Sequence, residues 1–291
     1  MDIRSIGMGL LFALIWSSAF TSARIIVADA PPFAISAIRF AIAGCIGVAI
    51  ARALGQTWHL TREQWRATLI FGLCQNALYL GLNFLAMTTV EASLASIVAS
   101  TMPLIVAFIG WAILREGLGP LAALGLVLGF GGVLLIMGSR MGTGVDPMGL
   151  AYCVIAAVGL AVATLMVRGA SSGGNMMMIV GLQMFVGAGV LLIASLFLET
   201  WVFNWNPVML TALTYTILAP GLLATWVWFA LVARIGAVKA ATFHFLNPFF
   251  GVAIAALILG EKLGLMDVLG VAIIAAGILA VQLSKQTHTA K

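Results

Sequence analysis

The sequence predicts an all-α integral membrane protein with ten transmembrane helices in two inverted five-helix repeats. Of its 291 residues, 63% are hydrophobic and only 8% are charged. A water-soluble domain cannot cover that much apolar surface, so the composition predicts a membrane protein. A motif that recurs after 145 residues, from Pro103 to Pro248, predicts the two repeats.

Apolar runs long enough to cross a bilayer recur along the whole chain. A transmembrane helix needs about 20 predominantly apolar residues. The first run follows Arg4 and continues to Arg24 without a convincing signal-cleavage site, so we expect it to be a helix of the mature protein. The expected spans are 6–27, 33–53, 67–87, 92–114, 118–137, 147–167, 176–198, 207–232, 237–259 and 263–283.

The fourth and ninth expected segments carry the recurring motif. Pro103 and Glu116 align with Pro248 and Glu261 without a gap. A proline inside an apolar run removes a backbone donor and weakens the helix, which a membrane tolerates only where protein or a cavity satisfies the freed carbonyl. Because each half has an odd number of spans, the second half enters the membrane from the opposite side. We expect repeats at 1–140 and 147–285 and a cytoplasmic tail at 286–291.

Lysine and arginine predict the orientation. The N-terminus, the loops after even-numbered spans and the C-terminus together carry ten basic residues, against four on the other side. Cytoplasmic loops carry an excess of Lys and Arg. Both termini are therefore expected in the cytoplasm.

The sequence lacks the residues that several classes of function require. The three cysteines lie in apolar runs without metal-ligand spacing, so we expect no metal site. The net charge of +5 is scattered over helix ends, which argues against nucleic acid. There is no G-x-x-x-x-G-K-[ST] motif for ATP and no cluster of catalytic side chains. We expect no enzyme activity, no catalytic residues and no cofactor.

Several short motifs follow one another in a fixed order along the chain. They are Leu14-Ile-Trp16-Ser17-Ser18-Ala-Phe20, Ile38-Arg39-Phe40, Glu91-Ala92-Ser93, Pro103 and Glu116 in the first half, and Pro248, Gly260-Glu261, Gly270 and Gly277 in the second. Their order resembles the EamA family of the drug/metabolite transporter superfamily. The second half lacks the Trp-Ser pair of the first span and the Arg of the second, but the similarity covers nearly the whole chain. The resemblance implies two five-helix repeats and export of small metabolites across the bacterial inner membrane, with the greatest overall likeness to aromatic amino acid exporters of the YddG type.

Polar side chains at helical spacing inside the spans mark faces that line a cavity. They offer amides, hydroxyls and aromatic rings without a full charge, a surface that suits a zwitterion with an apolar side chain. The candidate substrate-binding residues are Trp16, Ser17, Asn76, Tyr79, Asn83, Ser100, Trp226, His244 and Asn247. The candidate hinges are Pro103, Pro220 and Pro248.

Other polar and small residues have structural interpretations. His244 itself is open to two, a ligand to substrate or a core histidine bonded to another helix. We expect Ser93 and Ser96 to bond their own backbone or to pack helices. Gly125-x-x-x-Gly129 is expected to form a close-packing face, either between the repeats or between subunits. Arg39 is expected to hold carbonyls or Asp29 near a helix end. Glu116 and Glu261 are expected to cap helix junctions through Arg115 and Lys262.

The acidic residues fall near helix ends, which favours facilitated export over proton antiport. Only His244 is placed to titrate within the membrane. The expectation is a secondary transporter of small amino-acid-like metabolites that works by alternating access at a cavity between the repeats. Proton-coupled export of other amino acids or of drug-like amphipathic metabolites stays open, and a membrane channel is the alternative from a different class. We expect a monomer whose partners are a small-molecule substrate and the lipid bilayer, with no nucleic acid.

Overall fold

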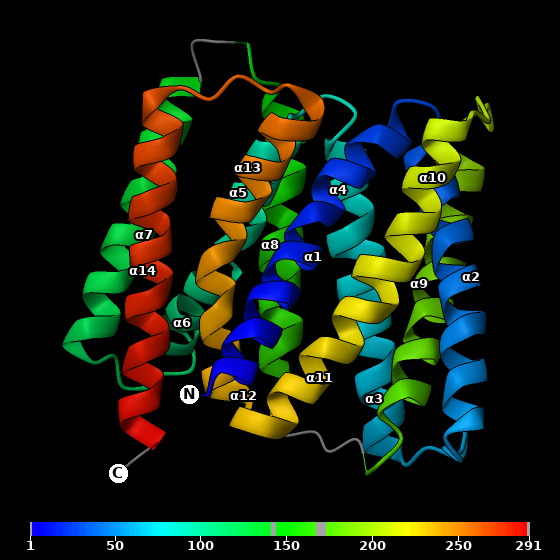
Figure 1. The fold of residues 1–291 in the computed structure, drawn as a ribbon, viewed down its shortest axis with the longest axis horizontal. Coiled ribbons are helices and arrows are strands. Elements are labelled where there is room, and N and C mark those ends of the chain that lie inside the picture. Colours follow the sequence, from blue (N-terminus) through cyan, green and yellow to red (C-terminus); the bar gives the residue numbers. More distant parts are fainter. Residues whose placement is uncertain (1, 141–143, 167–172, 290–291) are drawn as a thin grey trace. The chain divides into compact units, whose positions relative to one another are not determined.

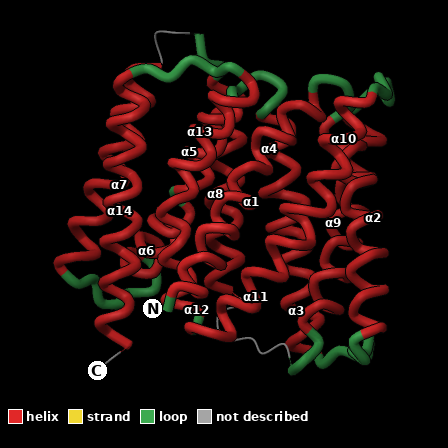
Figure 2. Tube along the Cα trace, viewed as in Figure 1, coloured by secondary structure: helices red, strands yellow, loops and turns green. Residues whose placement is uncertain are grey.

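The computed structural model describes residues 2–140, 144–166 and 173–289. Within these ranges the chain is helical with short loops and no strand (Figure 2). Among the described residues, ten helical segments are long and apolar enough to cross a membrane, which confirms the predicted all-α class and its ten spans. Arg168 and Lys291, two of the basic residues behind the predicted orientation, and the last residue of the expected span 147–167 lie outside the described residues.

Six of the ten segments are single helices, and four combine several elements (Figure 1). The third joins α3, η1 and α4, the fourth α5 and α6, the eighth α10, η3 and α11, and the ninth α12, η4 and α13. In chain order the elements are α1 (Ile3–Val27), α2 (Pro32–Ala53), α3 (Arg62–Phe71), η1 (Gly72–Leu80), α4 (Gly81–Ala86), α5 (Ala92–Ser100), α6 (Met102–Ala112), α7 (Pro120–Arg140), α8 (Pro147–Met166), α9 (Met176–Leu198), α10 (Pro207–Thr216), η3 (Ile217–Leu223), α11 (Ala224–Ile235), α12 (Ala237–Ala241), η4 (Thr242–Leu246), α13 (Asn247–Leu259) and α14 (Leu265–Thr289).

The spacing of 145 residues recurs in the positions where these elements begin. The elements α3, η1, α5, α6 and α7 begin at residues 62, 72, 92, 102 and 120. Their counterparts α10, η3, α12, α13 and α14 begin at 207, 217, 237, 247 and 265, each 145 residues later. The changes of helix geometry thus recur at the same spacing as the motif that contains Pro103 and Pro248.

Contacts divide the chain into two compact units that do not coincide with the predicted repeats. Unit 1 comprises Met1–Thr21, Thr89–Leu150 and Leu223–Lys291, and unit 2 comprises Ser22–Thr88 and Ala151–Leu222. Each unit thus takes segments from both halves of the sequence.

In unit 1, α7 and α14 lie side by side and approach closely at glycines (Figure 1). A β-carbon at Gly125 would lie 2.7 Å from the carbonyl oxygen of Gly277, and one at Gly132 would lie 2.9 Å from that of Gly270. Small residues of this kind let helix backbones touch in a membrane. The close-packing face predicted at Gly125-x-x-x-Gly129 is therefore confirmed, and its partner is α14.

In unit 2, α2 and α9 form the main helix pair. A β-carbon at Gly44 would lie 3.1 Å from the carbonyl oxygen of Gly181, and one at Gly181 would lie 2.8 Å from the amide nitrogen of Val48. The π-helical η1 packs on the same helix, where a β-carbon at Gly72 would lie 2.8 Å from the Gln183 carbonyl oxygen. Both units are thus built around one glycine-mediated helix pair.

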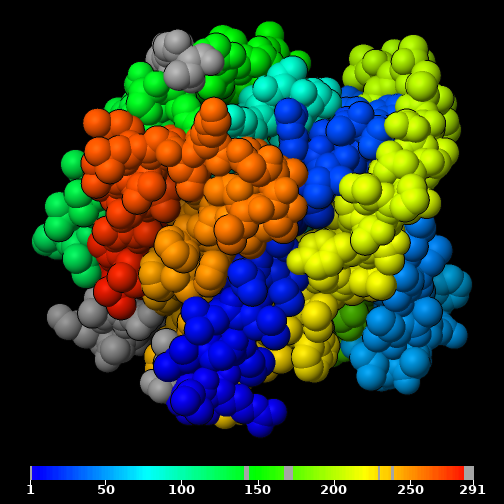
Figure 3. All heavy atoms as spheres, turned by 45° about the horizontal axis from the view of Figure 1, so that its top comes forward, coloured from blue at the N-terminus to red at the C-terminus, as the bar shows by residue number. Residues whose placement is uncertain are grey.

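Large apolar side chains remain exposed on the helices. Leu257 and Ile258 of α13, the orange helix that faces the viewer in Figure 3, are 85% and 63% exposed. In α9, Phe197 is 83% exposed. Such surfaces are expected where lipid, not water, surrounds a helix.

Candidate functional site

Aromatic rings from two helices surround His244 in unit 1. The ring of Phe12 in α1 meets the imidazole edge-on with centroids 5.4 Å apart, and the ring of Trp228 in α11 lies 5.2 Å from it. Phe12 also contacts Trp228 at 4.8 Å and Trp16 at 5.7 Å. Within this aromatic cluster, Phe12 is only 2% exposed, whereas His244, Trp16 and Trp228 are half-buried.

Asn247 ties this aromatic cluster to its surroundings. Its Nδ2 lies 2.9 Å from Nδ1 of His244, and the Ser17 hydroxyl donates to its backbone carbonyl at 3.2 Å. Because an amide nitrogen only donates, the imidazole Nδ1 accepts, and a neutral ring then carries its proton on Nε2. The Asn247 Oδ1 is buried and has no hydrogen-bond partner among the described residues. The structure thus brings together four predicted site residues, Trp16, Ser17, His244 and Asn247.

Two tryptophans of α11 lie in different surroundings. Trp228 joins the aromatic cluster, whereas the predicted site residue Trp226 is 60% exposed and makes no ring contact with a described residue. Sequence reasoning did not select Phe12, because a phenylalanine in an apolar helix carries no signal that separates it from its neighbours.

Two serines of α5 are expected from sequence to bond their own backbone or to pack helices. The side-chain oxygens of Ser93 and Ser96 are buried without a hydrogen-bond partner in the described chain, so the first alternative does not hold. Ser96 packs on Gly251 of α13, where a β-carbon would lie 1.8 Å from its Oγ, which agrees with the second. The predicted site residue Ser100 donates to the Ser96 carbonyl at 2.6 Å. The Ser100 hydroxyl thus satisfies a carbonyl at the end of α5.

The three predicted site residues of unit 2 lie on η1 and α4 and are at most 3% exposed. Asn76 donates to the Gln183 carbonyl of α9 at 2.9 Å, which ties two helices together. Asn83 donates to the Tyr79 carbonyl at 2.8 Å, and its Oδ1 has no partner among the described residues. Asn76 therefore has a packing role, while Asn83 keeps a free acceptor.

Each predicted hinge proline lies where helix geometry changes. Pro103 is in the first turn of α6, directly after the break at Thr101, and Pro248 is in the first turn of α13, after the 3₁₀ segment η4. Pro220 lies inside the π-helical η3. η1 is also π-helical although no proline lies in it, so this change of geometry was not predicted.

Carboxylates cap two helix N-termini through backbone amides. Glu261 accepts from the amides of Ala92 and Ser93 at 2.8 and 3.0 Å, so the expectation that it acts through Lys262 is wrong. Glu199 accepts from the amides of Phe33 and Ala34 at 2.7 and 2.9 Å. These amides have no partner within their own helix, and the positive end of the helix dipole favours an anion there.

Asp29 does not hold Arg39, contrary to the expectation from sequence. Asn204 and Asn206 each donate to its carboxylate at 2.7 Å. Arg39 instead lies on the rings of Phe40 and Phe84, with Cζ 4.3 and 4.4 Å from their centroids. An amide pair has therefore taken the place of the predicted ion pair.

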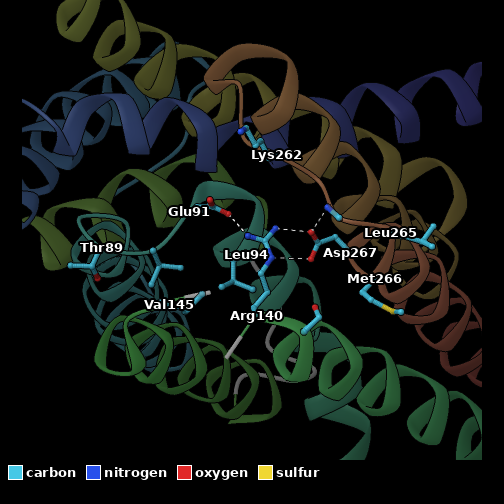
Figure 4. A pocket seen from close by; sticks show the side chains of 13 residues that line it. Thr89, Glu91, Leu94, Arg140, Val145, Lys262, Leu265, Met266 and Asp267 are labelled. Carbon is cyan, nitrogen blue, oxygen red and sulfur yellow. Dashed lines mark hydrogen bonds and ion pairs between the residues drawn. The ribbon is translucent and has the colours of Figure 1, made fainter. Parts of the chain in front are cut away.

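A cavity of about 500 Å³ lies in unit 1 beside the end of α7 and the start of α14 (Figure 4). The guanidinium of Arg140 lies between Asp267, which it contacts with Nε at 3.0 Å and Nη2 at 2.8 Å, and Glu91, contacted by Nη1 at 2.5 Å. Thr89, which lines this cavity, donates its hydroxyl to Asp146. This bond and the amides of Met148 and Gly149 in α8 hold the pKa of Asp146 below its usual value. This charged cluster joins three elements at one end of unit 1.

The comparison with known families decides the class of the protein. The sequence pattern of the EamA-like transporter family matches residues 3–138 and again residues 147–283. The chain belongs to the EamA-like transporter family. The family resemblance noted from the motifs is thereby confirmed, and the protein is a multi-pass membrane protein of a transporter family.

Relatives of this EamA-like transporter include both uncharacterized transporters and one named exporter. The uncharacterized transporter YvbV of Bacillus subtilis is 26% identical over 95% of this chain and 91% of its own length. The aromatic amino acid exporter YddG of Ancylobacter novellus is 27% identical, over 46% of each chain. A solved crystal structure with 19% identity has a TM-score of 0.69 and covers 98% of this chain and 99% of that one, which shows a shared fold.

Proposed function

We propose that this EamA-like transporter exports small amino-acid-like metabolites, aromatic amino acids first among them, as a secondary transporter with alternating access. The observation that carries the proposal is the aromatic cluster around His244 together with the unpaired Oδ1 of Asn247. Rings attract a cation through their faces, and an amide oxygen accepts from an ammonium group. The cluster therefore suits the amino group and the apolar side chain of an amino acid.

The partial similarity to an aromatic amino acid exporter supports the same substrate class. That alignment covers 46% of the chain, so it supports the class without assigning a substrate. The family supports a multi-pass membrane protein. We propose that it lies in the bacterial inner membrane with both termini in the cytoplasm, because basic residues are in excess on that side.

Paired glycine contacts support an inverted relation between the repeats. Gly270 lies 145 residues after Gly125, and Gly132 lies 145 residues before Gly277. Gly125 contacts Gly277, and Gly270 likewise contacts Gly132. A pair of contacts that maps onto itself in this way is what a two-fold relation between antiparallel helices produces. Alternating access in such transporters exchanges the conformations of two repeats, and the breaks at Pro103, Pro220 and Pro248 are the proposed hinges.

Efflux from proteoliposomes tests the function. Vesicles loaded with tryptophan, phenylalanine, threonine or cysteine should release the aromatic pair faster, with saturation and stereoselectivity, and an imposed pH gradient should not change the rate. Acceleration by the gradient would favour proton coupling through His244, the ionisable side chain within the aromatic cluster. Flux that does not saturate would indicate a channel, and release of none of the four would refute the substrate class.

The variant Asn247→Leu tests whether the Asn247 side chain takes part in transport. It removes the free acceptor and keeps a side chain of similar volume, so we expect slower efflux with unchanged membrane expression. Normal efflux from this variant would show that the aromatic cluster of unit 1 is structural.

A further inference from the structure

Arg39 is a buried cation inside a membrane span. It follows Pro32, the first residue of α2, by seven positions, about 10 Å along the helix axis at 1.5 Å per residue. The residue is 5% exposed. An ionised group at such a depth is unfavourable unless it is paired, and intramembrane charges usually mark a functional site.

The aromatic contacts of Arg39 do not replace an anion. Phe40 and Phe84 offer ring faces to the guanidinium at 4.3 and 4.4 Å. Such contacts orient the planar group and stabilise its charge. They offer no acceptor to the N–H groups, which lie in the guanidinium plane.

Two nitrogens of Arg39 are left without partners. Nε and Nη2 are both buried and make no hydrogen bond to any described residue. Their N–H groups point the same way and form the edge of the guanidinium that binds a carboxylate with two parallel hydrogen bonds. Arg140 shows the same edge filled: its Nε and Nη2 contact the two oxygens of Asp267 at 3.0 and 2.8 Å.

None of the acidic side chains in the described residues is paired with Arg39. Of the nine acidic residues, three lie in unit 2: Asp29 is held by two asparagines, Glu199 caps α2, and Glu63 is exposed in the first turn of α3. The other six lie in unit 1 and are placed elsewhere. Asp2 contacts Arg234, Glu91 and Asp267 contact Arg140, Asp146 accepts from Thr89, Glu261 caps α5, and Glu116 is exposed in the loop after α6.

Further unpaired polar atoms lie on the same two helices. The Ser36 hydroxyl, one turn before Arg39 in α2, is fully buried and has no partner among the described residues. On α4, the residue next to Phe84 is Asn83, whose Oδ1 is also unpaired. Buried polar atoms are normally hydrogen-bonded, so several together indicate that a ligand completes them.

We propose that the Nε–Nη2 edge of Arg39 binds the carboxylate of the transported solute. The inference rests on the proposed function, because it assigns the acidic end of an amino-acid-like substrate to this side chain. The recognised chemistry is a carboxylate with an adjacent apolar group, since the Phe40 and Phe84 rings border the guanidinium.

Counterflow in proteoliposomes tests this assignment with three probes that share one ring. L-phenylalanine carries the carboxylate, L-phenylalaninamide replaces it with a neutral amide, and 2-phenylethylamine lacks it. Wild type should take up phenylalanine at least tenfold faster than either analogue. Arg39→Gln should remove this preference by lowering phenylalanine uptake tenfold to a hundredfold, with little change for the analogues.

Arg52→Gln is the matched control, because Arg52 is an exposed arginine in the last turn of the same helix. It should keep the wild-type preference. Arg39→Lys keeps the charge but not the bidentate edge, so an intermediate preference is expected even if the glutamine variant fails to fold. Equal loss for all three probes, or normal phenylalanine uptake by both Arg39 variants, would show that Arg39 is structural and would overturn the proposal.

A second measurement separates this proposal from the proposed function and from lipid binding. In detergent without lipid, 3-phenylpropanoate should raise the melting midpoint of wild type and not that of Arg39→Gln. That result would support the carboxylate site even if no amino acid is transported, in which case only the proposed function fails. Equal shifts in both proteins, or stabilisation of wild type by phosphatidylglycerol alone, would refute the assignment.

Discussion

Gly277→Ala is expected to force α7 and α14 apart. A β-carbon at position 277 would lie 2.5 Å from the amide nitrogen of Gly129 and 2.6 Å from the carbonyl oxygen of Gly125. Ordinary contact begins at 3.4 Å, so the backbones must separate by about 0.9 Å. The obstructing atoms belong to backbone and cannot rotate away as a side chain would.

The size of the effect follows from two opposing contributions. Overpacking costs about 1–3 kcal/mol, and the rigid backbone neighbours place Gly277→Ala near the upper limit. Alanine is favoured over glycine inside a helix by about 1 kcal/mol, which leaves a net loss of about 2 kcal/mol. Gly131→Ala is the matched control, because a β-carbon there meets nothing within 4 Å and only the gain of about 1 kcal/mol remains. The two variants should differ by about 3 kcal/mol.

Reversible unfolding of the purified protein in mixed micelles measures this difference. The midpoint should fall for Gly277→Ala and rise slightly for Gly131→Ala. If Gly277→Ala is stabilised as much as Gly131→Ala, the helices do not touch at Gly277 and the packing argument is refuted. If both are destabilised equally, the helix tolerates no alanine on either face and the contact with Gly129 is not the cause.

Three further predictions follow from single contacts. Glu199→Ala removes the acceptor of two α2 amides and should cost about 1–2 kcal/mol in the same unfolding assay, whereas Glu63→Ala should change little; equal effects would refute the cap. Trp228→Ala should slow efflux of aromatic amino acids more than Trp226→Ala, and the reverse order would place the substrate on the other side of α11. The pKa of Asp146 is lowered in the folded protein, because its carboxylate accepts from Thr89 and caps α8. This contribution to stability is therefore complete above the usual pKa of 3.8 and is lost as the pH falls through the lower folded pKa. Asp146→Asn should reduce this loss of stability in acid, and an unchanged pH profile of unfolding would contradict the cap.

The sequence was sufficient for the ten helices, because a bilayer imposes length and polarity on every span. It also located the interruptions near Pro103, Pro220 and Pro248, since proline acts on its own helix whatever surrounds it. The break in η1 has no such local cause. A π-helical turn without proline depends on packing, here against α9, which a single sequence does not display.

Partners of charged groups could not be predicted for a different reason. Glu199 binds amides 165 and 166 residues away, and Arg140 binds Asp267 across 127 residues. Sequence reasoning chose neighbours instead, and so paired Glu261 with Lys262 and Arg39 with Asp29. The free backbone amides at the start of a helix bind a carboxylate well. Every residue except proline has such an amide, so the sequence does not indicate which amides a carboxylate will contact.

The unpaired buried atoms differ in kind between the two units. Unit 1 offers an acceptor, the Asn247 Oδ1, beside the aromatic rings around His244, and unit 2 offers two donors, Nε and Nη2 of Arg39, beside two phenylalanines. Each unpaired group carries a desolvation cost of about 1–3 kcal/mol, more for a charge, which folding alone does not offset. Within unit 1 the Asn247 acceptor has the chemistry to take a proton donor such as an ammonium group, and within unit 2 the Arg39 edge has the chemistry to take a carboxylate. Each unit is therefore tested by itself, unit 1 with Asn247→Leu and unit 2 with Arg39→Gln.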